Sequence, residues 1–158
     1  MKIQKISPFL WYDSEAEEAA RHYVAAFPDA RITTIERYPK GAPAPEGSVM
    51  TVAFELAGQS FTALNGGPMF KPTEAVSFAV SCDDQAEVDR LWEHLSQGGS
   101  TSMCGWLKDR WGFSWQIVPR RFVEIIATGD GAAKGRVFAA MMQMTKFDLA
   151  KIEAAYKG

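Results

Sequence analysis

Alternating apolar and polar positions predict two sets of strands, each interrupted by one amphipathic helix. The strands of the first set are expected at residues 6–12, 31–37, 48–57 and 60–65, and its helix runs from residue 15 to about 26. Those of the second set are expected at residues 76–82, 101–104, 106–108 and 114–118, with a helix over residues 85–96. Ser14 and Asp84 stand where helix caps are expected. The strand at 6–12 is apolar almost throughout, so its inward face stays open.

The pattern changes after Pro119. A short helix is expected at 120–127, a turn at 128–131, a longer helix at 132–144 and a last helix at 149–156, capped by Asp148. Several apolar side chains of this tail need a covering surface: Phe138, Met141, Met142, Met144 and Phe147. The tail therefore either folds back on its own sheet or packs against a second subunit.

Two pairs of segments show that the chain repeats itself. Segment 7–13 resembles segment 77–83 at an offset of 70, and segment 58–64 resembles segment 112–118 at an offset of 54. The first copy therefore carries extra residues, visible as the proline-rich stretch 38–47. The repeat predicts an α+β fold with two β-α-β-β-β modules. We expect module 1 at about 3–67, module 2 at about 75–119 and a helical tail at about 120–157, in a single domain spanning 1–158.

The composition and charge of the chain indicate which kinds of partner are not expected. The 158 residues are 47% hydrophobic and 23% charged, which is typical of a globular domain. The net charge is −2 and no dense basic cluster is present, so nucleic acid is not expected as a partner. No apolar stretch approaches the roughly 18 residues of a membrane span, and the amino terminus lacks the pattern of a signal peptide. With only two cysteines and no disulfide pattern, we expect a cytoplasmic protein without a membrane partner.

Several motifs resemble the PhnB-like branch of the vicinal oxygen chelate superfamily, which includes glyoxalase I, extradiol dioxygenases and bleomycin-resistance proteins. The branch often carries the label "3-demethylubiquinone 3-methyltransferase-like". The similar stretches are 8–11 (PFLW), 16–20 (AEEAA), 47–52 (GSVMTV), 63–68 (ALNGGP), 104–109 (CGWLKD), 114–119 (SWQIVP) and 142–146 (MQMTK). The resemblance implies paired modules whose strands curl into an open, cup-like mixed barrel, commonly in a homodimer.

Enzymes of this superfamily hold a divalent metal with His and Glu side chains on inward strand faces. The corresponding positions here hold Ile6 or Ser7, together with Thr62, Ser77 and Gln116. Both histidines, His22 and His94, fall on expected helices instead. Hydroxyls and one amide do not form a tight transition-metal site. We therefore expect no metal and no other cofactor.

Without a metal, the hollow of the cup is the candidate site for a small-molecule ligand. If Gln116 faces inward, strand alternation puts Ser114 and Val118 on the same side. Ser77, Ala79 and Ser81 would lie beside them, whereas Trp115 and Ile117 would face the helices. Such a lining suits a modest neutral ligand. Alternatively, these small residues only fill a crowded barrel floor.

Three further residues complete the candidates. Cys104 and Trp106 flank a glycine at an expected bend, and Lys108 follows closely. A nearby cation would lower the pKa of the Cys104 thiol and raise its thiolate fraction. No histidine base is near in sequence, so a structural or partly buried thiol is favoured. Asn65 opens the turn before Met69, where branch members often carry His. The candidate ligand-binding residues are Gln116, Ser77, Ser114, Thr62, Cys104, Trp106 and Asn65.

Methyl transfer is rejected because no Gly-x-Gly-x-x-Gly element follows a strand. The favoured function is metal-independent binding or sequestration of a small molecule. The alternative is an enzyme of isomerase, lyase or dioxygenase type that uses Gln116 and Cys104. A metal-dependent lyase or dioxygenase is least favoured.

Overall fold

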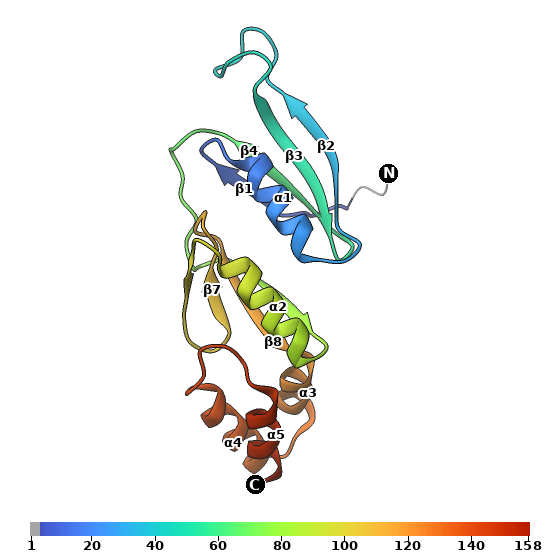
Figure 1. Cartoon of the computed structure of the whole chain (residues 1–158), viewed down its shortest axis with the longest axis vertical. Coiled ribbons are helices and arrows are strands. Elements are labelled where there is room, and N and C mark those ends of the chain that lie inside the picture. The colour runs from blue at the N-terminus through green and yellow to red at the C-terminus, as the bar shows by residue number, and fades with distance from the viewer. Residues whose placement is uncertain (1–3) are drawn as a thin grey trace. The chain divides into compact units, whose positions relative to one another are not determined.

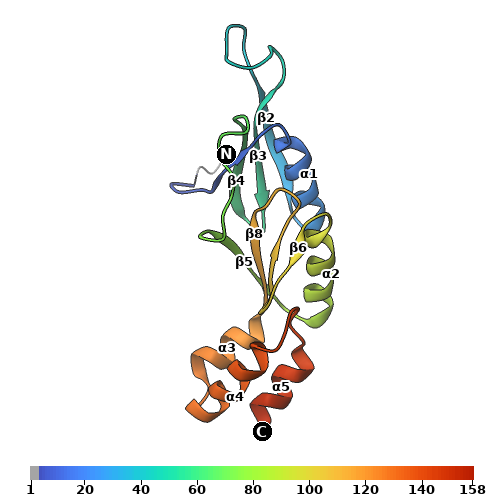
Figure 2. The ribbon, with the colours of Figure 1, turned by 90° about the vertical axis from the view of Figure 1, so that its left-hand side faces the viewer.

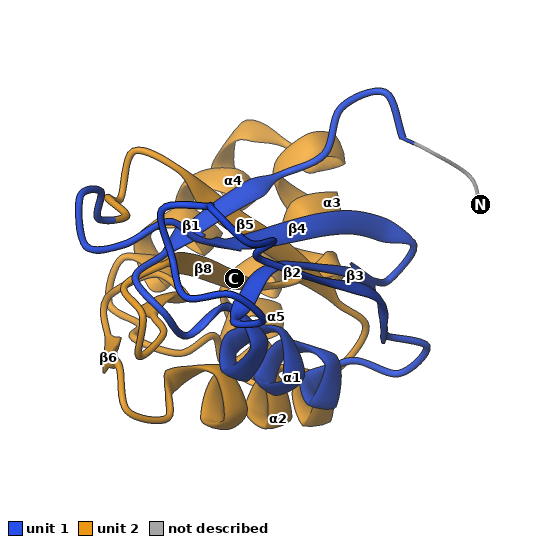
Figure 3. Ribbon diagram, turned by 90° about the horizontal axis from the view of Figure 1, so that it is seen from above, with its two compact units in different colours: residues 1–71 blue, residues 72–158 orange. Residues whose placement is uncertain are grey.

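The computed structural model describes residues 4–158, which divide into two compact units. The first ends at Lys71 and the second spans Pro72–Gly158 (Figure 1; the units are coloured separately in Figure 3). Each unit contains one four-stranded mixed sheet and helices, which confirms the α+β class. That the two units form a single domain stays a prediction.

The first unit has the strand order β1-β4-β3-β2. Its elements are β1 (Phe9–Tyr12), α1 (Ala16–Ala26), β2 (Arg31–Arg37), β3 (Val49–Leu56) and β4 (Gln59–Asn65). β1 lies parallel to β4, and the other pairs are antiparallel. Helix α1 covers one face, where Tyr23 packs against Phe54. Alanines 16, 19 and 20 are fully buried, so the helix approaches the sheet closely.

The second unit repeats this arrangement in the order β5-β8-β7-β6, with α2 on one face. Its elements are β5 (Ser77–Cys82), α2 (Gln85–Ser96), β6 (Ser100–Thr101), β7 (Trp106–Lys108) and β8 (Ser114–Pro119). The parallel register confirms the sequence repeat. Phe9 pairs with Thr62 in the first sheet and Ala79 with Gln116 in the second, at the offsets of 70 and 54.

The tail folds back on its own sheet. Of the two alternatives, packing within the chain therefore holds for the buried side chains of the tail. It forms α3 (Arg120–Thr128), α4 (Gly131–Met141) and α5 (Leu149–Lys157), grouped at one end of the second unit (Figure 2). The backbone N–H groups of Cys104 and Gly105 donate to the carbonyls of Met144 and Thr145. Phe147 is buried beside Gly105, whose left-handed φ of +79° and lack of a Cβ allow this approach. Phe138 and Met142 remain about half exposed.

Three elements differ from the sequence prediction by more than one residue at an end. The first strand begins at Phe9 rather than residue 6, and its buried face, on the side of α1, is that of Leu10 and Tyr12. The strand expected at 101–104 shrinks to Ser100–Thr101, because the following backbone turns and bonds to the tail. The helix expected to end at residue 144 ends at Met141.

Ser14 is also not the cap of α1. The first helical N–H, that of Ala16, instead donates to Asn65 Oδ1 at 2.8 Å. Asp84, Asp130 and Asp148 do cap α2, α4 and α5 with their own carboxylates. In the part of the chain described, no helix has the length and apolar character needed to cross a bilayer.

Candidate functional site

The open face of the second sheet, opposite α2, brings five of the candidate residues together. One row of paired residues crosses β5, β8 and β7 and consists of Ser77, Ser114 and Lys108. Ala79, Gln116 and Trp106 form the next row. The other face is buried against α2 through Trp115, Ile117 and Leu107. The alternation predicted from the sequence therefore holds along β8.

Gln116 and Ser77 form a fixed polar pair on this face. Gln116 Nε2 donates to Ser77 Oγ at 2.9 Å. Within residues 4–158, the carboxamide oxygen of Gln116 has no protein partner, so it remains an acceptor for a ligand. The Ser77 hydroxyl, which accepts from Gln116, keeps its own proton to donate. One acceptor and one donor are thus presented side by side.

A cavity of about 400 Å³ lies beside this pair. Every lining residue is uncharged: Ala79, Val80, Ser81, Cys104, Trp106, Gln116, Val118, Phe122, Val123, Met141 and Phe147. The last four belong to the tail, which therefore forms one wall. We call this space the apolar cavity.

Cys104 stands in the wall of the apolar cavity, half-buried. Its Sγ lies 3.7 Å from the carbonyl oxygen of Met141 and 3.8 Å from Sδ of Met142. The cation that the sequence places nearby, Lys108, forms its ion pair with Glu74. The second thiol, Cys82, is fully buried, and desolvation raises its pKa to about 12. Cys82 therefore stays protonated and unreactive at neutral pH.

A second cavity of about 320 Å³ adjoins the other end of the same face. Its lining is rich in hydroxyls: Glu74, Ser100, Thr101, Ser102, Trp106, Leu107, Lys108 and Ser114. We call it the hydroxyl cavity. Trp106 lines both cavities.

The remaining two candidates, Thr62 and Asn65, belong to the first unit. Thr62 lies on the open face of the first sheet, paired with Phe9 and Ala53. Asn65 has a structural role: its Oδ1 accepts from Ala16 N–H, and its Nδ2 donates to the Val49 carbonyl. The Tyr38 hydroxyl donates to the Asn65 carbonyl at 2.6 Å. Each polar end of the Asn65 amide therefore already has a structural partner.

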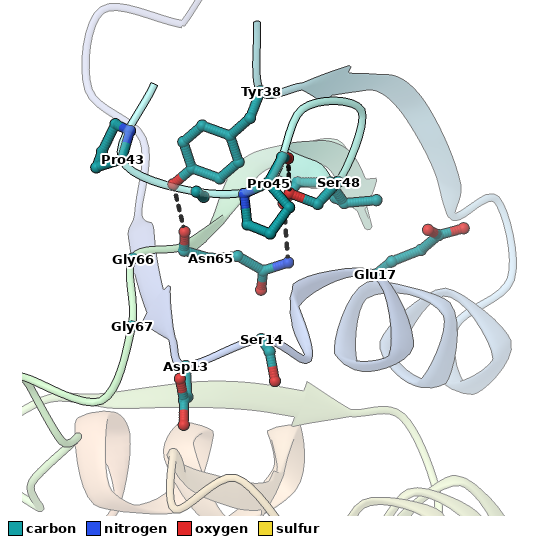
Figure 4. Close-up of a pocket in the computed structure, with 12 residues that line it drawn as sticks. Asp13, Ser14, Glu17, Tyr38, Pro43, Pro45, Ser48, Asn65, Gly66 and Gly67 are labelled. Atoms are coloured by element: carbon teal, nitrogen blue, oxygen red, sulfur yellow. Dashed lines mark hydrogen bonds between the residues drawn. The ribbon is translucent and has the colours of Figure 1, made fainter. Parts of the chain in front are cut away.

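Asn65 also lines a cavity of about 540 Å³ in the first unit, under the proline-rich loop (Figure 4). This loop connects β2 and β3, as the repeat predicts. Part of the polar lining is already engaged: Glu17 pairs with Arg21, and the Ser48 hydroxyl donates to the Pro45 carbonyl, while Asp13 and Ser14 add two further polar side chains. The hydrogen bonds here hold the loop on the unit, so this larger cavity is a weaker candidate than the face of Gln116.

The positions expected to replace metal ligands do not fit a metal. Ile6 and Ser7 precede β1, Thr62 offers one hydroxyl, and Ser77 and Gln116 bond to each other. His22 lies in α1 and His94 in α2. Over residues 4–158, no three His, Cys, Asp or Glu side chains come together as a metal-binding group.

The sequence reasoning missed the contribution of the tail to the site. Phe122, Met141 and Phe147 line the apolar cavity, yet they follow the repeat and have no counterpart in module 1. The sequence indicated that Met141 and Phe147 need a covering surface, but not which surface, and it did not single out Phe122. Glu74 was also missed, because no local pattern connects it with Lys108.

Residues 4–118 match the family described as 3-demethylubiquinone-9 3-methyltransferase. A PhnB protein from Bacillus cereus is 34% identical, over 73% of this chain and 99% of that chain, with a TM-score of 0.68. A protein from Pseudomonas aeruginosa is 20% identical, over 74% of this chain and 98% of that chain, with a TM-score of 0.62. A fosfomycin resistance protein from Mesorhizobium loti is 16% identical, over 81% of this chain and all (100%) of that chain, with a TM-score of 0.54.

The last two similarities show a shared fold only. A comparison with curated proteins finds no match. The family match covers both modules and stops just before the tail, at the end of β8. The paired modules, their register and the family match agree with the sequence motifs, and the chain therefore belongs to the PhnB-like 3-demethylubiquinone-9 3-methyltransferase family.

Proposed function

We propose that this protein binds an uncharged, largely apolar small molecule on the open face of its second sheet, without a metal. The observation that carries the proposal is the Gln116–Ser77 pair beside a cavity without a charged lining residue. An ion would lose its hydration there without a countercharge, whereas an apolar group gains free energy on burial. The paired amide and hydroxyl would orient one polar group of the ligand.

The family description names methyl transfer, but we propose binding without methyl transfer. Each sheet has one parallel strand pair and two antiparallel pairs. Nucleotide-like methyl donors usually bind at the carboxyl edge of a doubly wound parallel sheet, behind a glycine-rich loop. Calorimetric titration with S-adenosylmethionine should give no binding heat, and saturable binding would contradict this part of the proposal.

An enzymatic role inside the apolar cavity would have to use Cys104, the one titratable side chain among its lining residues. Its thiol contacts a carbonyl and a thioether, and neither is a base that could accept its proton. Binding is therefore favoured over nucleophilic catalysis.

The binding experiment uses p-cresol, an uncharged ring with one hydroxyl, as the probe. Titration followed by NMR should shift the Gln116 side-chain amide and the Trp106 indole N–H. Gln116→Ala should weaken binding about 3- to 10-fold, the usual value of one neutral hydrogen bond. Gln97→Ala, at the exposed end of α2, is the matched control and should leave the affinity unchanged. Equal affinity in Gln116→Ala and the parent, or no shift of either group at saturating probe, would overturn the proposal.

The homodimer and the cytoplasmic location stay predictions. The mass in solution, measured by sedimentation equilibrium, tests the first, because a mass of 17.5 kDa would identify a monomer.

A further inference from the structure

The hydroxyl cavity contains a polar atom that the fold leaves without a partner. Ser114 is only 1% exposed, and among the described residues its Oγ has no hydrogen-bond partner. A buried polar group without a partner destabilises the folded protein, so such an atom needs an explanation. Ser114 lines the hydroxyl cavity, where a bound molecule could supply that partner.

The rest of the lining indicates what kind of molecule fits. Ser100, Thr101 and Ser102 add three more hydroxyls, each of which can both donate and accept. The two charged groups, Lys108 and Glu74, neutralise each other in an ion pair. An anion would have to displace Glu74 from Lys108, and a cation would have to displace Lys108 from Glu74. A neutral molecule with several hydroxyls can bond to both without separating them.

Trp106 supplies the apolar part of this cavity. It is half-buried, and its neighbour Gln116 pairs with it in register. Sugars and cyclitols have apolar C–H faces beside their hydroxyls, and such faces pack on aromatic rings. An indole beside four hydroxyls therefore matches a polyhydroxylated ring better than a purely apolar one.

We propose that the hydroxyl cavity binds a neutral polyhydroxylated group, of the sugar or cyclitol class. The proposal deepens the proposed function and rests on it, because Trp106 lines both cavities. The ligand class is then amphipathic. Its apolar part occupies the cavity beside Gln116, and its polyol part reaches Ser114.

The test uses the full chain, with myo-inositol as the polyol probe and p-cresol as the separate probe of the apolar cavity. Inositol should shift the Trp106 indole N–H and the amides of residues 100–102. Ser114→Ala should weaken inositol binding at least about 5-fold, the loss of one hydrogen bond. The same variant should leave p-cresol affinity unchanged. Ser96→Ala, at the end of α2 and outside both linings, is the control and should bind both probes like the parent.

Other outcomes overturn the proposal in recognisable ways. Inositol binding that is absent, or equal in Ser114→Ala and the parent, would mean that water alone satisfies the Ser114 hydroxyl. Shifts with inorganic phosphate or acetate but not inositol, suppressed by salt, would identify an anion site at Lys108. In either case, retained p-cresol binding would leave the proposed function standing. Because Ser114→Ala removes an unpartnered buried hydroxyl, it should melt at the same temperature as the parent or higher, so a folding defect would be visible.

Discussion

The two modules share the same strand order and register, but the side chains on their open faces differ in size and chemistry. At equivalent positions, module 1 carries Phe9 beside Thr62, whereas module 2 carries Ala79 beside Gln116. The next pair along the parallel strands is Trp11 with Leu64 in module 1 and Ser81 with Val118 in module 2. A duplicated fold has thus kept its register and helix-facing core while its open faces became chemically different.

The difference decides which module has space for a ligand. On the first face, the Trp11 ring lies edge-on to Phe70, with centroids 4.9 Å apart, and its Nε1 donates to the Gly67 carbonyl. Large rings occupy this face. On the second, small side chains at positions 79 and 81 leave a cavity that the tail closes on one side.

The modules also differ in how they anchor their helices. Asp84 caps α2 locally, and its Oδ1 accepts from Glu87 N–H. The cap of α1 comes from Asn65, on a strand 49 residues away in the chain. Module 1 therefore couples its helix to its sheet through a side chain, whereas module 2 couples its sheet to the tail through Gly105.

The largest expected effect on stability compares two of the close approaches that glycine permits, at Gly105 and Gly66. A Cβ at Gly105 would lie 2.7 Å from the Phe147 ring and 2.8 Å from the Ile117 carbonyl oxygen, at positive φ. Gly105→Ala should lower the free energy of unfolding by about 3–5 kcal/mol, because backbone cannot yield. For Gly66→Ala, the three atoms nearest to the added Cβ all belong to the Trp11 side chain, which can shift more easily than backbone, so this change should cost about 1–3 kcal/mol.

Urea denaturation measures both variants. Gly135→Ala is the control, because nothing lies within 4 Å of its added Cβ in helix α4. This change should stabilise by about 0.5–1 kcal/mol. If Gly105→Ala costs no more than Gly66→Ala, the docking of the tail on module 2 is not as tight as described.

A smaller effect compares the two helix caps. Asn65→Ala removes the cap of α1 and leaves the Val49 carbonyl without its side-chain donor, so it should cost about 2 kcal/mol. Asp84→Ala removes a local cap and should cost about 1 kcal/mol. Chemical denaturation gives both values. Equal costs would show that the long-range cap of module 1 adds nothing beyond a local one.

The smallest expected effect on stability comes from replacing Ala79 of module 2 with phenylalanine, the residue at the equivalent position 9 of module 1. Ala79→Phe puts a ring beside Gln116, into the apolar cavity. Because position 79 is exposed, the free energy of unfolding should change by no more than about 0.5 kcal/mol. Affinity for p-cresol should fall at least about 10-fold, or 1.4 kcal/mol.

The reciprocal change, Phe9→Ala, removes a side chain that is 61% exposed on the first face and should leave p-cresol affinity unchanged. If p-cresol affinity is unchanged in Ala79→Phe, or changes in Phe9→Ala, the ligand binds outside the apolar cavity.

The sequence by itself determined the repeat, the order of the elements and which side of β8 faces the helix. These features depend on alternation and periodicity over a few residues, and a strand with Trp115 and Ile117 on one side can bury only that side. The repeat offsets also imply that the two sheets share one register, and the structure shows which residues pair.

Only the tertiary structure decided that Asn65 caps a helix, that Glu74 neutralises Lys108 and that Phe147 closes the cavity of Gln116. Each of these contacts joins residues far apart in the chain, and no local period connects them. The same residue types could have met other partners at equal local cost. Their roles therefore follow from how the sheet, the loops and the tail pack within each unit.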